Sequence, residues 1–374
     1  MEAEGSNVGD TAIFQSQYRD LTAMGLETGI MTADPERTRS RYPGIRCFDV
    51  NKGRLRAMAA AAAWSDIVIV GGGELVQDSS SLLYSPFNLL PLFLARLMGK
   101  KSYAWAVGIG QGSELRRSTR MLTRFAARSA DGITVRDRGS FNTLHHLGLR
   151  EPEMLLTSDC ALSLEFERCP KDNLIGAAPR DVSNRTGHLL PLEVRRKLGA
   201  KTKANPEAGA MAWARLLDWC SQRYAADVVL FPFHTGSLSN DDGAFCRMVA
   251  HRMKRGGAVS IADPGDTNGF LKSIARCRVM VTTPLHGAIL AFAGGTVPVS
   301  VSYSSKCLRF MEQAGLQELV SHGTPGIPDR STAVAVEKAW KGNDEFRLRM
   351  DERAEQLRAR AKRTPEHFRK TFGL

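Results

Sequence analysis

The stretch VTTPLHGAILAFAGGTVPVSVSYSSK, residues 281–306, decides how this chain folds. A β-rich run ends at Pro284, a pattern of small apolar residues, AILAFAGG, follows, and a second β-rich run, VPVSV, comes next. This alternation predicts a strand, a buried helix and a second strand, which is the repeating unit of a parallel sheet. A single histidine, His286, stands where the first strand gives way to the helix, and Lys306 follows the second strand.

The same alternation runs along most of the chain. Continuous apolar β-like runs separated by helix-length stretches predict parallel sheets covered by helices on both faces, which is doubly wound α/β architecture. The predicted strands are residues 66–70, 102–108, 132–135, 153–158, 173–178, 227–233, 258–262, 278–283 and 297–301. The first helical pattern begins almost at Met1, so either the chain lacks the first strand of the series or its start has been assigned late.

The length and the placement of breaks predict two domains and a tail. A chain of 374 residues is long enough for two ordinary cores. Pro170 and the charges around it predict a boundary, with an N-terminal domain at residues 1–165 and a C-terminal domain at 166–330. Residues 331–374 carry Glu, Arg and Lys at apolar helical spacing, which predicts an amphipathic helical tail.

Composition excludes several protein classes. We do not expect the acidic start MEAEGSNVGD to act as a signal peptide, and the most apolar window, residues 82–99, is too interrupted by proline and polar residues to span a bilayer. Seven cysteines without a C-x-x-C pair predict neither a zinc site nor a disulfide framework. We therefore expect a cytoplasmic protein without a bound metal. The formal charge of +12 favours an anionic partner without identifying it.

Two glycine-rich stretches, residues 71–78 and 108–113, each follow a predicted strand. Neither matches the dinucleotide fingerprint, because Val76 and Ser113 stand where its last glycine should be. We expect them to form one wall of a ligand crevice, where Gly72 and Gly73 let the backbone approach a phosphate.

Three further side chains directly follow predicted strands: Arg136, His234 and His286. In a doubly wound fold this position lines the ligand crevice, where an arginine fork can bind carboxylate or phosphate. A surface ion pair, or a helix cap formed by Asp137, is the plainer alternative for the arginine segment. A structural role is equally open for both histidines.

A basic stripe is predicted on one helix by arginines at four-residue spacing: Arg116, Arg120, Arg124 and Arg128. The same spacing places apolar residues on the opposite side: Leu115, Leu122 and Phe125. The stripe is either a solvated face or a contact with an anionic membrane or a lipid-linked pyrophosphate. Because no aromatics are expected among the arginines, nucleic acid is not an expected partner.

The order of these pieces resembles the polysaccharide pyruvyl transferase family. The resemblance covers roughly residues 5–316 and rests on SNVGDTAI, DIVIVGGGELVQD, AVGIGQG, ADGITVRDRGSFNTLHHLG, TSDCALSL, IGAAPR, VVLFPFHTGSLSNDD and TTPLHGAILAFAGGTVPVSVSYSSKCLRFMEQAGL. It implies two Rossmann-like domains of the glycosyltransferase-B type with the active site in the cleft between them. It also implies that no nicotinamide, flavin or zinc cofactor is needed.

The activity that the resemblance implies is transfer of pyruvate from phosphoenolpyruvate to a pair of sugar hydroxyls, giving a pyruvate ketal in exopolysaccharide or cell-surface polysaccharide synthesis. The acceptor would be a saccharide or a lipid-linked oligosaccharide. His286 is suited to protonate the enol carbon of the donor. Lys306, with Arg136 and Arg180, would neutralise donor charge. Asp10 is the candidate acceptor-side base, with helix capping as its alternative role.

Asn7 and Asp159, in SNVGDTAI and TSDCALSL, complete the expected substrate-binding set with Gly72, Gly73 and His234. One departure concerns Pro284, which stands where the family pattern usually has an arginine. Arg278 and Lys306 are the candidates to compensate for that charge. The missing first strand is a second departure, because it would weaken the loop that carries Asn7.

Two other functions stay open at the level of sequence. A nucleotide-sugar glycosyltransferase of the same architecture would need an acidic contact to a ribose, for which Asp263 or Asp266 is available. A degenerate member that binds sugars or partner enzymes without catalysis is favoured by Pro284 and opposed by the retention of His286, Arg136 and Lys306.

Overall fold

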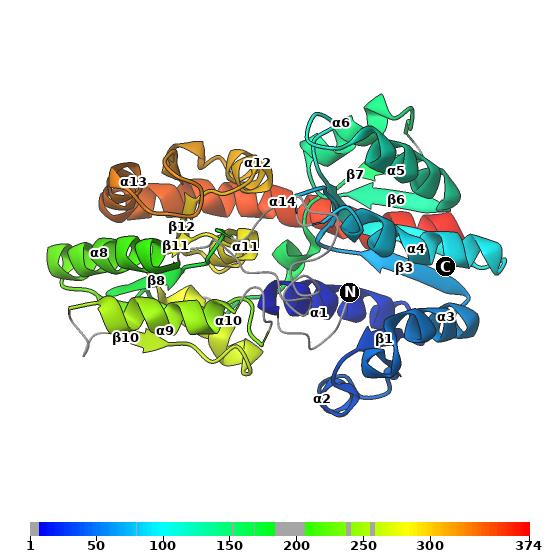
Figure 1. Ribbon diagram of the computed structural model, residues 1–374, viewed down its shortest axis with the longest axis horizontal. Helices are drawn as coiled ribbons and strands as arrows, with labels where there is room; N and C mark the ends of the chain where they lie inside the picture. Colours follow the sequence, from blue (N-terminus) through cyan, green and yellow to red (C-terminus); the bar gives the residue numbers. More distant parts are fainter. Residues whose placement is uncertain are drawn as a thin grey trace. The chain divides into compact units, whose positions relative to one another are not determined.

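The computed structural model describes residues 7–79, 81–151, 153–167, 169–183, 206–236, 241–254 and 259–374. The chain divides into two compact units (Figure 1). Of the described residues, unit 1 comprises those up to Leu164 together with Leu357–Leu374. Unit 2 comprises the described residues from Glu165 to Gln356.

Unit 1 alternates helices and strands. Its helices are α1 (Val8–Ala23), α2 (Pro35–Arg41), α3 (Arg54–Trp64), α4 (Tyr84–Leu97), α5 (Arg117–Ser129) and α6 (Arg138–His146), with 3-10 turns η1 (Val50–Lys52) and η2 (Cys160–Ser163). Its strands are β1 (Gly29–Thr32), β2 (Arg46–Asp49), β3 (Ile67–Gly71), β4 (Glu74–Val76), β5 (Lys101–Ile109), β6 (Gly132–Val135) and β7 (Met154–Leu156).

These strands form two parallel sheets. The larger sheet has the order β3-β5-β6-β7 with β4 also paired to β5, whereas β1 and β2 pair with each other. In the described chain, β1 and β3 therefore each have one neighbour.

The edge position of β3 is visible in its burial. Ile67, Val68 and Ile69 are half-buried, whereas residues 102–109 of its neighbour β5 are all buried.

Strand β5 also contains an irregularity that the sequence pattern does not predict. Ala106 has a φ of 48°, and the register with β6 shifts between Ala104 and Val107. Such a bulge bends the strand near its carboxyl end, where side chains of a site are positioned.

Unit 2 contains one six-stranded parallel sheet. Its strands are β8 (Leu174–Ala178), β9 (Asp227–Leu230), β10 (Val259–Ile261), β11 (Val279–Thr282), β12 (Val297–Val301) and β13 (Val320–Ser321). The helices around it are α8 (Pro206–Tyr224), α9 (Asp242–Arg252), α10 (Thr267–Arg276), α11 (Leu285–Ala293), α12 (Ser305–Gln313) and α13 (Arg330–Lys341), with the turn η4 (Gln317–Leu319). The strand order is β10-β9-β8-β11-β12-β13, so the chain reverses its direction of winding between β8 and β11.

The helical tail is shared by the two units. Helix α14 (Asn343–Phe372) belongs to unit 2 up to Gln356 and to unit 1 from Leu357 onwards. In unit 1, Phe368 of this helix is fully buried against the rings of Tyr103 and Trp105. The predicted tail is thus helical, as expected, and its last part completes the core of the first unit.

All nine predicted strand positions carry strands, which confirms the α/β architecture with parallel sheets; residue 258 of one predicted run lies outside the described residues. Four short strands were not predicted: β1, β2, β4 and β13. β4 lies inside the glycine-rich stretch at residues 71–78, which was expected to form one wall of a ligand crevice and for which no strand was predicted.

The prediction for α5 was wrong in one respect. Phe125 was expected on the apolar side of this helix, but its side chain is 61% exposed. The buried face consists of Thr119, Thr123, Ala126 and Ala127. Because small and β-branched polar residues fill the inward face, the larger Phe125 lies outside, among the arginines.

Candidate functional site

The carboxyl ends of β8 and β11 form the point in unit 2 where the strand order reverses, which is where doubly wound folds bind ligands. Arg180 lies two residues beyond β8, and His286 lies four residues beyond β11. The pairing of the two strands continues into this region, because the backbone N–H of Thr283 donates to the Ala178 carbonyl at 3.0 Å. The predicted arginine and histidine therefore follow adjacent strands of one sheet.

Arg180 is held by a partner that sequence reasoning missed. Its Nε donates to Oδ1 of Asp242 at 2.9 Å and its second guanidinium nitrogen to Oδ2 at 2.6 Å. The backbone N–H of His234 donates to the same carboxylate at 2.9 Å. Burial alone would lower the pKa of Arg180, but the Asp242 carboxylate outweighs this effect and raises it. Asp242 thus ties Arg180 and the His234 backbone together.

Tyr303 connects Arg180 to Lys306. The Tyr303 side chain forms a hydrogen bond with Arg180, and the Lys306 ammonium lies 5.6 Å from the centre of the Tyr303 ring. Lys306 lies in the first turn of α12, directly after the loop that follows β12. Sequence reasoning missed Tyr303, although it stands three residues before the lysine in the stretch YSSK.

His286 lies in the first turn of α11, whose other residues are all buried. The helix approaches its own strand closely, because a Cβ at Gly287 would lie 2.0 Å from Oγ1 of Thr282. The Cys307 thiol on α12 contacts the Thr283 carbonyl at 3.8 Å. This contact brings the lysine-bearing helix against the segment that leads to His286.

Three other predicted residues have different positions. Arg278 was a candidate to replace a missing donor contact, but it precedes β11, at the opposite end of the strand from His286, with its guanidinium 4.9 Å from the Trp340 ring centre. That hypothesis was wrong. Asp263 and Asp266 follow β10, and each accepts a local backbone N–H, from Gly265 at 2.8 Å and Gly269 at 3.0 Å.

In unit 1, Asn7 rather than Asp10 caps helix α1. The Asn7 side-chain oxygen accepts the Gly9 N–H at 3.0 Å, and its amide nitrogen donates to Asp10 Oδ2, also at 3.0 Å. Gly72 and Gly73 follow β3 with φ values of 67° and 73°, which favour glycine. A Cβ at Gly73 would lie 4.0 Å from Asp10 Oδ1. The structure therefore brings Asn7, Asp10 and the glycine pair together.

Arg136 and Asp159 form a buried ion pair in the same unit. The two side chains are joined at 2.8 Å, and each is 5% exposed. Burial by itself would lower the pKa of Arg136, but the carboxylates of Asp159, Asp137 and Glu74 raise it. The guanidinium lies against Gly108, where a Cβ would be 2.8 Å from Nε. Arg136 is thus fixed by its own unit rather than extended toward solvent.

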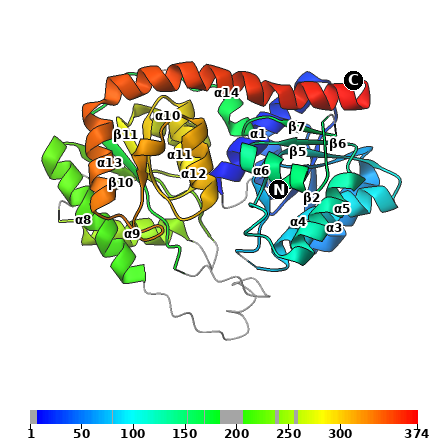
Figure 2. The ribbon, with the colours of Figure 1, turned by 90° about the horizontal axis from the view of Figure 1, so that it is seen from above.

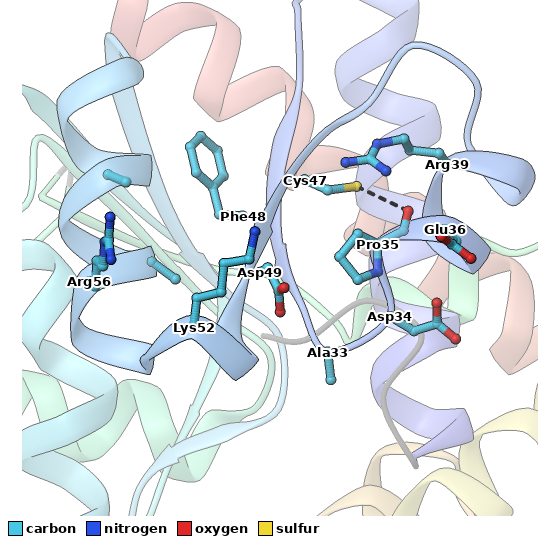
Figure 3. Close-up of a pocket in the computed structure, with 12 residues that line it drawn as sticks. Ala33, Asp34, Pro35, Glu36, Arg39, Cys47, Phe48, Asp49, Lys52 and Arg56 are labelled. Atoms are coloured by element: carbon cyan, nitrogen blue, oxygen red, sulfur yellow. Dashed lines mark hydrogen bonds between the residues drawn. The ribbon is translucent and has the colours of Figure 1, made fainter.

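A cavity of about 560 Å³ opens elsewhere in unit 1, at the carboxyl ends of β1 and β2 (Figure 3). Arg39 of α2, Lys52 of η1 and Arg56 of α3 line it together with Asp34 and Asp49. Both of these carboxylates accept backbone N–H groups at the starts of α2 and η1. None of the predicted site residues lines this cavity.

Two kinds of site are absent from the described residues. No cluster of three or more histidine, cysteine or acidic side chains there could hold a metal ion. None of the described helices combines the length and apolar character that crossing a bilayer requires.

Comparison with known sequences matches the family model described as polysaccharide pyruvyl transferase to residues 7–305. The amylovoran biosynthesis protein AmsJ of Erwinia amylovora is 25% identical over 324 residues, which are 82% of this chain and 73% of AmsJ.

Comparison with solved structures agrees on the fold. MnaA of S. aureus, in a co-structure with UDP, superposes with a TM-score of 0.64 at 12% identity, covering 97% of this chain and 94% of that one. The UDP-GlcNAc 2-epimerase of Neisseria meningitidis, bound to UDP-GlcNAc, gives a TM-score of 0.62 at 10% identity, covering 97% of each chain. At these identities the likeness establishes the fold, which is glycosyltransferase-B-like, as the sequence predicted.

Proposed function

Because this chain belongs to the polysaccharide pyruvyl transferase family, we propose that it transfers pyruvate from phosphoenolpyruvate to two hydroxyls of one sugar. The family match places it among transferases of polysaccharide biosynthesis, and its similarity to an amylovoran biosynthesis protein agrees with that role. The observation that carries the proposal is that the segments bearing His286, Arg180 and Lys306 contact one another near the point in unit 2 where the strand order reverses.

The reaction requires one proton transfer to carbon and two attacks on one centre. The methylene carbon of the donor takes a proton, and its neighbouring carbon becomes electrophilic. One sugar hydroxyl bonds to that carbon, the carbon–oxygen bond to phosphate breaks, and the second hydroxyl bonds to the same carbon. Of the two hydroxyl protons released, one balances the proton taken by the methylene carbon and the other leaves with phosphate.

We assign the donor to the unit 2 residues. His286 supplies the proton, since imidazole changes charge near neutral pH and a positioned general acid contributes about 10²–10⁴-fold. Lys306 offsets the developing negative charge on the leaving phosphate. Arg180 contributes mainly by holding Tyr303 in place and by fixing the Asp242 carboxylate, which accepts the His234 N–H.

The acceptor is assigned to unit 1. Asp10 accepts a hydroxyl proton, and Asn7 orients its carboxylate through the amide hydrogen bond. Gly72 and Gly73 leave room for a saccharide beside that carboxylate. Arg136 and Asp159 stabilise the neighbouring strand ends through their buried ion pair.

A thermal-shift titration tests the donor. A ligand at about 100 times its dissociation constant stabilises the native state by about 2.7 kcal/mol, so phosphoenolpyruvate should raise the melting temperature. The shift should persist in His286→Ala, whereas pyruvate transfer should fall about 10²–10⁴-fold. His251→Ala, an exposed histidine of α9, is the matched control and should retain both. Absence of any shift with phosphoenolpyruvate in the wild type contradicts the proposal.

A nucleotide-sugar glycosyltransferase is the second candidate. The structural neighbours described above were solved with UDP or UDP-GlcNAc, which favours including UDP- and GDP-sugars in the same titration. Asp263 and Asp266 are engaged in local turns and caps, which argues against them as ribose ligands. Stabilisation by a nucleotide sugar and not by phosphoenolpyruvate would favour this candidate, and stabilisation by neither would favour a non-catalytic role.

A further inference from the structure

Helix α5 and the residue before it carry an unusual density of positive charge. Arg116, Arg117, Arg120, Arg124 and Arg128 are all exposed, and no acidic residue occurs between Arg116 and the end of the helix. Within the described chain, none of these five guanidinium groups forms a hydrogen bond or ion pair with another residue. Their charge is therefore directed to solvent or to a partner.

Two large apolar side chains lie among these arginines. Met121 is 55% exposed and Phe125 is 61% exposed, and they are one helical turn apart. The inward face is already filled by Thr119, Thr123, Ala126 and Ala127, so the apolar pair takes no part in the core. We call the five arginines with Met121 and Phe125 the α5 surface.

The α5 surface lies on the outside of unit 1. Figure 2 shows α4 and α5 along one side of the larger sheet and the last part of α14 along the other. Helix α4 packs against α5, and its last residue, Leu97, and the following Met98 are 83% and 41% exposed. The same side of the unit thus carries further exposed apolar side chains.

We propose that the α5 surface binds an anionic lipid bilayer, with its arginines at the headgroup phosphates and Met121 and Phe125 inserted at the interface. Charge complementarity favours this partner, because clustered basic residues are attracted to anionic leaflets. The apolar pair distinguishes it from nucleic acid, since a bilayer interface offers an apolar layer directly beneath its charges. The proposal does not depend on the donor or on catalysis.

Sedimentation with vesicles tests the proposal on the full chain. The protein should bind vesicles containing phosphatidylglycerol, should not bind vesicles of phosphatidylcholine alone, and should lose binding as salt concentration rises. Arg120→Glu with Arg124→Glu should weaken binding roughly 25-fold or more, because each basic residue near such a surface contributes roughly five-fold. Met121→Ser with Phe125→Ser should also weaken it while leaving the charge unchanged.

A matched control separates this surface from net charge. Arg363→Glu with Arg369→Glu makes the same charge change on exposed positions of α14 in the same unit, and it should bind as the wild type does. Melting curves confirm that each variant folds. If the glutamate variant does not fold, Arg120→Gln with Arg124→Gln replaces it. Equal loss in the α14 control overturns the proposal. The proposal is also overturned if the protein binds single-stranded RNA more tightly than anionic vesicles and Phe125→Ser leaves that RNA binding intact. Binding to neutral vesicles as strong as binding to anionic ones overturns it too.

Discussion

Arg180 and Asp242 form a two-point ion pair, with nitrogen–oxygen distances of 2.9 and 2.6 Å, although 62 residues separate them in the chain. The Asp242 side chain is 2% exposed, and its Oδ2 also accepts the His234 N–H. One carboxylate therefore fixes the residues that follow β8 and β9.

Asp242→Asn should lower the free energy of unfolding by about 3–5 kcal/mol, because it leaves the charge of Arg180, whose side chain is only 16% exposed, without a counter-ion. Urea unfolding measures the change. Asp241→Asn is the matched control: Asp241 caps α9 by accepting the Ala244 N–H, and asparagine caps equally well. A loss at Asp242 no larger than at Asp241 would show that the ion pair contributes little.

Gly108→Ala should destabilise unit 1 by about 1–3 kcal/mol, the usual cost of overpacking. The new Cβ would lie 2.8 Å from Nε of Arg136, whose guanidinium is held by Asp159 and cannot move away without breaking their bond. Gly112→Ala, where no atom lies within 4 Å of the new Cβ, should change stability by less than about 0.5 kcal/mol. Chemical unfolding of both variants measures the two changes in the free energy of unfolding. Equal changes would contradict the conclusion that Arg136 cannot move away from the new Cβ.

Pro284→Arg should strengthen phosphoenolpyruvate binding by about 1.5–3 kcal/mol, the value of a charge-assisted hydrogen bond. The φ of −62° and ψ of 135° at this position suit any residue, and the Pro284 carbonyl would keep its bonds from Thr282 Oγ1 and the Gly287 N–H. Calorimetric titration measures the affinity. Pro284→Gln, of similar length without charge, should show no gain, and equal affinity of both variants would refute a donor contact here.

Asp329→Ala should cost about 1–2 kcal/mol at neutral pH, because Asp329 caps α13. Hydrogen bonds from the Ser331 side chain, and from the backbone N–H groups of Thr332 and Ser331, hold the pKa of Asp329 below its ordinary 3.8. A lowered pKa in the folded state means that the ionised cap stabilises above that value and that this stabilisation is lost as the pH falls through the folded pKa.

The difference between wild type and Asp329→Ala should accordingly shrink when unfolding is measured at about pH 3 instead of about pH 7. Glu352→Ala, an exposed carboxylate of α14, should show little difference at either pH. A constant difference for Asp329 across this range would mean that its charge does not stabilise the helix.

In some of the strands that the sequence predicted, such as β5 and β11, apolar and β-branched residues are buried almost continuously. The short strand β2, Arg46–Asp49, is half polar, and β4 is three residues long within a glycine-rich stretch, so neither has a local pattern. Pairing with a neighbour, which depends on distant residues, makes them strands.

The rule that site residues follow strands selected Arg136, His234 and His286, whereas Arg180 was named through the family resemblance. In the structure, Arg180 and His286 follow adjacent strands. The rule could not identify Asp242, because two ion-paired residues that are 62 positions apart produce no periodic pattern in the sequence. It also could not tell that Phe125 would be exposed, because helical spacing alone does not say which face packs on the sheet.

The separation of β1 and β2 from the larger sheet has a consequence for local opening. No backbone ladder joins the two sheets in the described chain, so side-chain packing around α1 and α3 holds the pair in unit 1. Isolated two-stranded pairs are weak on their own. The amides of β1 and β2 should therefore exchange with deuterium through a sub-global opening of lower free energy than those of β5, as a separate cooperative segment.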